Sequence, residues 1–196
     1  MGSLLATFSA ALEARDPYLR GHSSRVTAFA EGLALRLGWN GARVEALRLG
    51  GSLHDVGKIA VNARVLQKPG PLTPPELDQI RIHPDAGARL IGGVRDFQSA
   101  LPYVLHHHEQ WNGNGYPHGL KAEAIPIEAR LLGVADAFDA MTSARAYRPA
   151  LSVEQALAEL RRCAGTQFDP ELAHSFVDGW GRGQIGAMTG AVGLAS

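Results

Sequence analysis

Two short segments of this chain concentrate side chains that bind metals and contact phosphates. The first reads His54-Asp55-Val56-Gly57-Lys58, and the second, residues 107–117, begins with adjacent histidines and ends in a Gly-Tyr-Pro turn. Imidazole and carboxylate groups hold borderline and harder divalent metals. Lys58 follows Asp55 by three positions, which places both side chains on nearly the same face of a helix. This combination indicates metal-assisted chemistry on a phosphate ester.

His54 and Asp55 are consecutive in a predicted helix, so their side chains diverge by about 100°. Such a pair can flank one metal while the carboxylate reaches towards a second. Asp136 belongs to another predicted helix, whose small residues would let it approach closely. These small residues are Gly133, Ala137 and Ala140.

Five of the eight histidines fall at helix ends or in motifs, and we interpret them as members of a metal site. They are His22, His54, His83, His107 and His108. A lone histidine is more often an ordinary core or surface residue. We therefore give that interpretation to the remaining three, His106, His118 and His174.

The composition fits one domain with a full hydrophobic core. The chain has 196 residues, and its 19 Lys and Arg balance its 19 Asp and Glu. Zero net charge argues against broad capture of duplex nucleic acid or of an anionic membrane. A single cysteine, Cys163, permits no internal disulfide and favours a cytoplasmic location. No apolar run reaches the length of about 18 residues that a membrane-spanning helix needs, so we expect no membrane insertion.

Helical periodicity and helix-start signals account for the whole chain, and strand patterns are essentially absent. Thr73 and Glu76 form a capping box before one helix, Ser152 and Gln155 form another, and Asp169-Pro170 opens the last helix. Pro84 should interrupt the helix that begins after Thr73. The predicted helices span residues 4–15, 21–37, 41–57, 74–83, 97–108, 126–143, 152–163 and 169–179, with loops at 58–72 and 110–125.

The sequence thus predicts an all-α fold, a single helical bundle domain with a metal centre in its core. We place this domain at residues 1–180. Residues 181–196 are rich in Gly and Ala with little periodicity, and we expect a flexible tail.

The two segments together resemble the signatures of HD-GYP domains, a subgroup of the HD phosphohydrolase superfamily. The resemblance rests on His54-Asp55, on His107-His108-Glu109 and on the Gly-Tyr-Pro run of residues 115–117. It extends over roughly residues 10–175. Further matching segments lie at 13–18, 21–23, 68–73, 134–139, 147–149 and 165–170.

This resemblance implies a metal-dependent phosphodiesterase that hydrolyses cyclic di-GMP to pGpG, to GMP or to both. By matching positions, the metal ligands are His22, His54, Asp55, His83, His107, His108 and Asp136. Asp55 is expected to bridge two metals and Lys58 to contact a substrate phosphate. The positions that meet the substrate are Lys58, Arg145, Arg148, Gly115, Tyr116 and Pro117. Asp139 is expected to orient a ligand histidine or Lys58.

The resemblance also implies the cofactors and partners. Two divalent metal ions are expected, iron or manganese first, with zinc as an alternative that the same ligands accept. Some members hold a third metal with a glutamate four residues before the His22 position, but Tyr18 stands there in this chain. Expected partners are cyclic di-GMP, GGDEF-type cyclase domains and, as a further option, a second copy of the chain.

The chain departs from the common HD-GYP pattern in two places. Asn112 replaces the usual Asp before the first loop glycine, and Ala144 and Ala146 flank Arg145 where Asp and Pro are typical. Two other functions stay open. One is an HD phosphohydrolase that acts on another nucleotide, which the intact Gly-Tyr-Pro run disfavours. The other is a non-catalytic nucleotide- or partner-binding signalling module, which the complete set of ligand positions disfavours.

Overall fold

The computed structural model describes residues 12, 15–16, 20–144 and 149–186, and their regular structure is helical, as the sequence predicts. The α-helices are α2 (His22–Arg36), α3 (Gly41–Leu53), α4 (Ala63–Leu66), α5 (Pro74–Arg81), α6 (His83–Gly92), α7 (Leu101–His106), α8 (Ile127–Thr142), α9 (Val153–Arg162) and α10 (Pro170–Gly181). Three 3₁₀ segments join them, η2 (Val56–Ala60), η3 (Arg95–Ala100) and η4 (Ala122–Ala124). The predicted helix at residues 4–15 lies almost entirely outside the described residues.

Local capping chemistry explains where several helices begin. The capping boxes of Thr73 with Glu76 and of Ser152 with Gln155 are both present, at the starts of α5 and α9. The side chain of Asp169 accepts hydrogen bonds from the backbone N–H groups of Glu171 and Leu172 at the start of α10. These starts were predicted from the sequence because capping depends on residues only three positions apart.

The predicted helix at 41–57 was too long, because α3 ends at Leu53 and a 3₁₀ turn takes over at Val56. The cause is a close approach between this turn and α6. A Cβ atom on Gly57 would lie 1.9 Å from the carbonyl oxygen of His83 and 2.4 Å from the nitrogen of Gly87. Tertiary packing therefore sets the path of the chain here. The predicted loop at 58–72 also contains the four-residue helix α4, which is too short to produce a periodic pattern.

Proline positions explain two other helix boundaries. The helix predicted from 74 does break near Pro84, because α5 ends at Arg81 and α6 begins at His83 with Pro84 in its first turn. The helix predicted at 97–108 is divided into η3 and α7, and Pro102 lies in the first turn of α7. Proline has no N–H to donate and fits a helix only at its start. The helix α7 ends at His106, so His107 and His108 follow its end instead of lying within a helix.

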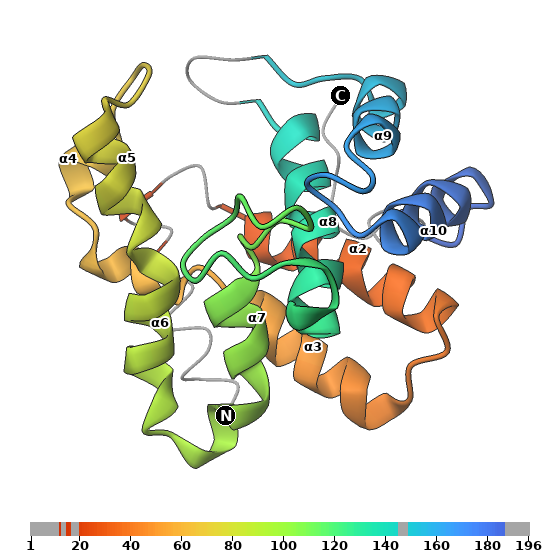
Figure 1. Cartoon of the computed structure of the whole chain (residues 1–196), viewed down its shortest axis with the longest axis horizontal. Coiled ribbons are helices and arrows are strands. Elements are labelled where there is room, and N and C mark those ends of the chain that lie inside the picture. The colour runs from red at the N-terminus through yellow and green to blue at the C-terminus, as the bar shows by residue number, and fades with distance from the viewer. Residues whose placement is uncertain (1–11, 13–14, 17–19, 145–148, 187–196) are drawn as a thin grey trace.

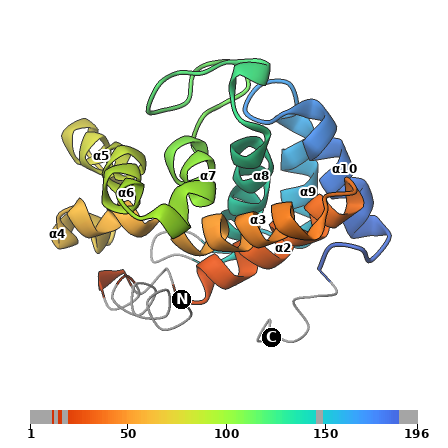
Figure 2. The same ribbon diagram turned by 90° about the horizontal axis from the view of Figure 1, so that it is seen from below.

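The helices form a bundle with α8 at its centre, as Figures 1 and 2 show. In both views α4, α5 and α6 lie at one end, α9 and α10 lie at the other, and α2 runs beside α3. The larger apolar core joins α2, α8, α9 and α10, and Phe29, Phe138 and Phe176 pack at its centre. A smaller core around Leu53, Val56, Ile91, Phe97 and Val104 joins α3, η2, α6, η3 and α7.

The residues that carry the predicted metal site lie along the boundary between these two cores. His54 and Asp55 stand between Leu53 and Val56 of the smaller core, whereas Asp136 follows Val134 and Ala135 of the larger core. The bundle thus brings polar side chains from both halves to one place.

Of the predicted tail, residues 182–186 follow α10, with Ile185 buried in the larger core, and the rest lies outside the described residues. The domain boundary at residue 180 stays a prediction. Among the described residues, no helix combines the length and the apolar character that a membrane crossing requires. The cytoplasmic location also stays a prediction.

Candidate metal centre

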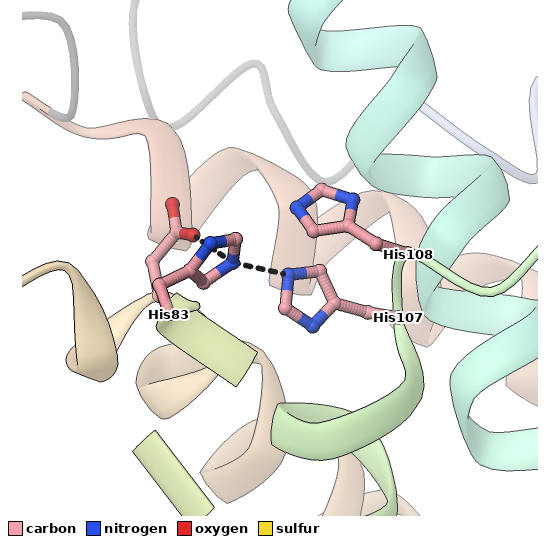
Figure 3. A group of neighbouring side chains, drawn as sticks. His83, His107 and His108 are labelled. Carbon is pink, nitrogen blue, oxygen red and sulfur yellow. Dashed lines mark hydrogen bonds and ion pairs between the residues drawn. The ribbon is translucent and has the colours of Figure 1, made fainter. Parts of the chain in front are cut away.

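The seven side chains predicted as metal ligands lie together in two adjoining groups. One group is Asp55, His83, His107 and His108, and the other is His22, His54 and Asp136. Within each group, the potential ligand atoms lie within 4.8 Å of one another. Figure 3 shows His83, His107 and His108 directed towards a common space, with the His83 and His107 Nε2 atoms 3.3 Å apart. Helices and helix-end segments that are distant in sequence thus meet at one cluster.

Asp55 lies between the two groups and faces both. Its Oδ1 atom is 3.5 Å from Nε2 of His83 in the first group. Its Oδ2 atom is 3.5 Å from Nε2 of His54 and 3.8 Å from Nε2 of His22 in the second. One carboxylate therefore presents one oxygen to each group, which is the arrangement that a bridging ligand requires.

The cluster histidines are held in place through their other ring nitrogen. The Nδ1 atoms of His54, His83 and His107 hydrogen-bond to the backbone carbonyl oxygens of Gly51, Ile80 and Tyr103, at 2.8, 2.8 and 3.0 Å. Such a contact fixes the ring and its tautomer, and it leaves Nε2 free to accept a metal. Nε2 of His54 is buried and has no hydrogen-bond partner within the described part of the chain, so a cation at this point would satisfy it.

His22 is oriented by a carboxylate instead of a carbonyl. Its Nδ1 atom lies 2.7 Å from Oδ2 of Asp139, while its Nε2 atom lies 3.3 Å from Oδ1 of Asp136. Asp139 is itself fixed by Arg25, whose Nε and Nη2 atoms donate to its two oxygens at 2.6 and 3.1 Å. Of the two roles expected for Asp139, the described contacts match the orientation of a ligand histidine. Arg25 was not predicted, although its position three residues after His22 is a usable signal.

The electrostatics of the cluster favour bound cations. Burial lowers the pKa of His83 to about 4 and that of His108 to about 3, so both rings are neutral at pH 7 and offer lone pairs. Burial opposes the ionisation of Asp55, but the charges around it, Lys58 first and then His54, His83 and His22, together outweigh burial and hold the pKa of Asp55 well below its usual range. For His22, burial is outweighed by the hydrogen bonds to Asp136 and Asp139 and by the charges of Asp136 and Asp55, which raise its pKa to about 9. His22 is therefore protonated at pH 7 when no metal is bound, and it would release a proton to become a ligand.

These residues fit divalent metal ions. The donors are imidazole nitrogens and carboxylate oxygens, with no thiolate among them, which suits iron, manganese or zinc. The carboxylate of Asp55 is buried and that of Asp136 is largely buried, and such charges need cations beside them. Gly133 of α8 helps to assemble the site, since a Cβ atom there would lie 3.0 Å from the carbonyl oxygen of His107. The small face predicted on this helix is thus in close contact with the histidine segment.

The cluster opens into a cleft of about 610 Å³. Lys58 lines this cleft, with its Nζ atom 2.7 Å from Oδ2 of Asp55. Beyond the cluster, the residues that line the cleft include Lys68, Leu72, Trp111 and Phe168. A volume of this size accommodates a small-molecule substrate with its reacting group at the metal cluster.

The Gly-Tyr-Pro loop lies beside the cluster, but its residues have different surroundings. The Tyr116 ring lines the cleft and packs on the His108 ring at a centroid distance of 4.8 Å. Gly115 and Pro117 are not among the lining residues. Instead, a Cβ atom on Gly115 would lie 2.3 Å from the nitrogen of Gln110, so the missing side chain lets the loop fold back on the histidine segment. Arg145 and Arg148, the two arginines predicted to bind substrate, lie outside the described residues.

A family model described as an HD domain matches residues 6–172 of the chain. Among characterised proteins, the chain is 38% identical over 194 residues to the cyclic di-GMP phosphodiesterase response regulator RpfG of Xanthomonas campestris pv. campestris. It is 36% identical over 167 residues to a cyclic di-GMP phosphodiesterase of Thermotoga maritima. These matches cover 98% and 84% of the chain but 51% and 45% of the relatives. The chain therefore spans about half the length of these relatives.

Solved structures agree with the fold. The crystal structure of a cyclic GMP-AMP specific phosphodiesterase of V. cholerae, V-cGAP3, superimposes with a TM-score of 0.66 at 22% identity. The match covers 91% of this chain and 48% of that one. At this level of identity the similarity shows the shared helical fold.

Proposed function

The chain belongs to the HD domain family, and we propose that it is a metal-dependent phosphodiesterase that hydrolyses cyclic di-GMP. The observation that carries the proposal is the position of Asp55, with one oxygen facing His83 and the other facing His54 and His22. This geometry suits two metal ions that share a carboxylate. The similarity to two cyclic di-GMP phosphodiesterases supports the choice of substrate.

The seven residues of the two groups would hold the metals. His83, His107 and His108 would hold one ion, His22, His54 and Asp136 the other, and Asp55 would contact both. When bound, two such ions supply positive charge and activate water for attack at phosphorus. We expect iron or manganese, because their preferred ligands are the nitrogen and oxygen donors present, and zinc is the alternative.

The chain's own residues then orient the reaction. Lys58 lies in the cleft beside Asp55 and would offset negative charge on a phosphate oxygen of the substrate. Asp139 holds the His22 ring in place, with Arg25 fixing Asp139 in turn. Tyr116 forms a wall of the cleft over His108 and limits the access of bulk water to that side. Arg145 and Arg148 are proposed as further phosphate contacts from the resemblance alone.

A second candidate is the hydrolysis of a different cyclic dinucleotide. The metal cluster and Lys58 act on the phosphodiester, which is shared by all such substrates, so the base preference depends on the other residues that line the cleft. The product, pGpG or GMP, depends on whether the linear intermediate rebinds.

We also propose contacts between the Gly-Tyr-Pro loop and GGDEF-type domains, supported by the exposure of Asn114 and Gly119. A homodimer stays a prediction.

The test is a hydrolysis assay on protein that has been purified anaerobically and loaded with iron or manganese. Cyclic di-GMP, cyclic di-AMP, cyclic GMP-AMP and a nucleoside triphosphate are compared as substrates, and products are separated by chromatography. We expect the fastest turnover with cyclic di-GMP. Faster turnover of another cyclic dinucleotide would change the substrate, whereas hydrolysis of the triphosphate alone would indicate a general nucleotide phosphohydrolase. Nucleotide binding without turnover would indicate a signalling module.

A further inference from the structure

A second group of potential metal ligands lies outside the central cluster, and it shares no residue with it. It consists of His106, Glu109 and His118, whose potential ligand atoms lie within 4.8 Å of one another. His106 is the last residue of α7, and Glu109 follows the histidine pair. His118 belongs to the loop that carries Tyr116. From the sequence alone, His106 and His118 were interpreted as ordinary residues, because their approach depends on the fold of this loop.

The three side chains are arranged around a common point. The rings of His106 and His118 have centroids 5.4 Å apart, and Nδ1 of His106 lies 3.9 Å from Oε1 of Glu109. A fourth donor is close by, because Oδ1 of Asp85 on α6 lies 3.9 Å from Nε2 of His118. Ligand atoms around a tetrahedral ion with bonds of about 2.0–2.1 Å are separated by about 3.4 Å. Small rotations of the side chains would therefore close the site on an ion.

Two features of this group are explained by a cation. The Nδ1 atom of His106 is buried and has no hydrogen-bond partner among the described residues. The Glu109 side chain is fully buried, and the described residues provide it with no arginine or lysine partner. Its oxygens accept the backbone N–H groups of His118 and Leu120 at 2.8 and 3.1 Å, which leaves each oxygen a further lone pair. A buried anion without a cation is costly, so an ion at this point would stabilise it.

We propose that His106, Glu109 and His118, with Asp85 as a fourth ligand, form a separate binding site for a borderline divalent transition metal, most suitably zinc. Two imidazoles and two carboxylates are the donor set that zinc accepts in tetrahedral sites. The ion would join the loop that carries Tyr116 to the end of α7 and to α6. The ion would thus stabilise the position of the Tyr116 loop beside the cleft without taking part in the reaction. The proposal is independent of the function proposed above.

The test compares zinc binding by the full chain with zinc binding by His118→Ala. Both proteins are stripped of metal and dialysed against micromolar zinc, and bound zinc per chain is measured by mass spectrometry. The His118 side chain is 48% exposed, so its removal should leave the fold intact, which circular dichroism checks. We expect His118→Ala to bind one equivalent of zinc less than the wild type. His174→Ala, which changes an exposed histidine on α10, should bind as much zinc as the wild type.

The proposal would be overturned if His118→Ala bound as much zinc per chain as the wild type. It would also be overturned if His174→Ala lost as much zinc as His118→Ala. Two replacements at the same position separate ligation from packing. His118→Cys supplies another zinc ligand and should restore the missing equivalent, whereas His118→Gln should not. Restoration by glutamine, or no restoration by cysteine, would count against the site.

The same measurement in an Asp55→Ala background separates this site from the central cluster. Asp55→Ala should lose the central ions and still show the equivalent that depends on His118. If Asp55→Ala binds as much zinc per chain as the wild type, the proposed function is refuted, but the site at His106, Glu109 and His118 is not. If Asp55→Ala loses the central ions and also the zinc equivalent that depends on His118, the proposal of a separate second site is refuted.

Discussion

Asp55 is the residue on which both halves of the cluster depend. Its two oxygens face different groups of histidines, and Lys58 balances its charge in the absence of metal. The sequence predicted this residue because His54-Asp55 is a compact local motif. The same local motif predicted the approach of Lys58, which follows three positions later. A separation of this size is preserved by any helical turn, so the prediction did not depend on the rest of the fold.

Asp55→Ala should remove both metal binding and phosphodiesterase activity. The substitution deletes the shared ligand, so the loss should exceed the roughly 10–100-fold effect that is typical when a partner of a ligand is removed. Metal content by mass spectrometry and turnover of cyclic di-GMP check this outcome. Asp178→Ala changes an exposed carboxylate on α10 and serves as the control. Retention of full activity by Asp55→Ala would refute the bridged cluster.

Lys58→Ala should keep the metals and lose activity. The ammonium group lies in the cleft and is a phosphate contact instead of a ligand, so kcat/KM should fall on the order of 10²-fold. Lys58→Arg retains a cation and should recover part of the loss. Both variants are assayed for bound metal and for turnover. A collapse of metal content in Lys58→Ala would show that the lysine supports the cluster itself.

Asp139→Asn should weaken metal binding about 10–100-fold, because the amide no longer fixes the His22 ring in the required tautomer. The affinity is measured by competition with a chelator, and Asp178→Asn is the matched control. An unchanged affinity would show that packing alone orients His22. Local patterns in the sequence placed Asp139 three residues after Asp136 but left its partner open, since His22 lies 117 residues away.

At the scale of elements, the sequence predicted helix starts better than helix ends. The capping boxes at Thr73 and Ser152 involve residues three positions apart, and the structure confirms both. The end of α3 was not predicted, because contacts between distant segments determine it. The division between η3 and α7 was not predicted either, because it depends on a proline within a helical pattern. His107 and His108 were therefore identified correctly as neighbours, but their place beyond the end of α7 was not foreseen.

Gly57→Ala should destabilise the domain and reduce metal binding. The new methyl group would meet the His83 carbonyl and the Gly87 backbone, and such overpacking costs about 1–3 kcal/mol in the free energy of unfolding. Because η2 follows Asp55 directly and α6 begins with His83, their separation would also pull the two ligands apart. Denaturant unfolding and metal analysis measure the two effects.

The control for this variant is Gly92→Ala at the end of α6. An added Cβ atom there meets none of the described residues within 4 Å, so the change should leave stability unchanged or raise it by about 0.4–1 kcal/mol. If Gly57→Ala behaves like Gly92→Ala, the close approach of η2 and α6 does not set the geometry of the cluster.

At the scale of the whole molecule, the metal cluster lies where two apolar cores meet. The larger core supplies Asp136 and His22 from α8 and α2, and the smaller core supplies the positions that flank His54 and Asp55. The sequence predicted an all-α domain from periodicity and the ligands from motifs. It did not predict which cores border the cluster, because that depends on pairings between helices far apart in the chain. Tyr116 over His108 is another such contact.

The number of metals follows from how the donors are distributed. The central cluster offers a group of four residues and a group of three, with Asp55 facing both, which suits two ions. The resemblance to HD-GYP domains associates a third ion with a glutamate at the position of Tyr18, which lies outside the described residues. A phenol is neutral at pH 7 and replaces a carboxylate poorly. We therefore expect two central metals per chain.

Anomalous scattering from crystals of the metal-loaded protein measures this count directly. The peripheral group of His106, Glu109 and His118 lies apart from the central donors, so its ion is counted separately from the central ones. His118→Ala removes that peripheral ion and leaves two central peaks, one on each side of Asp55. Three fully occupied central positions in His118→Ala would contradict the two-metal prediction.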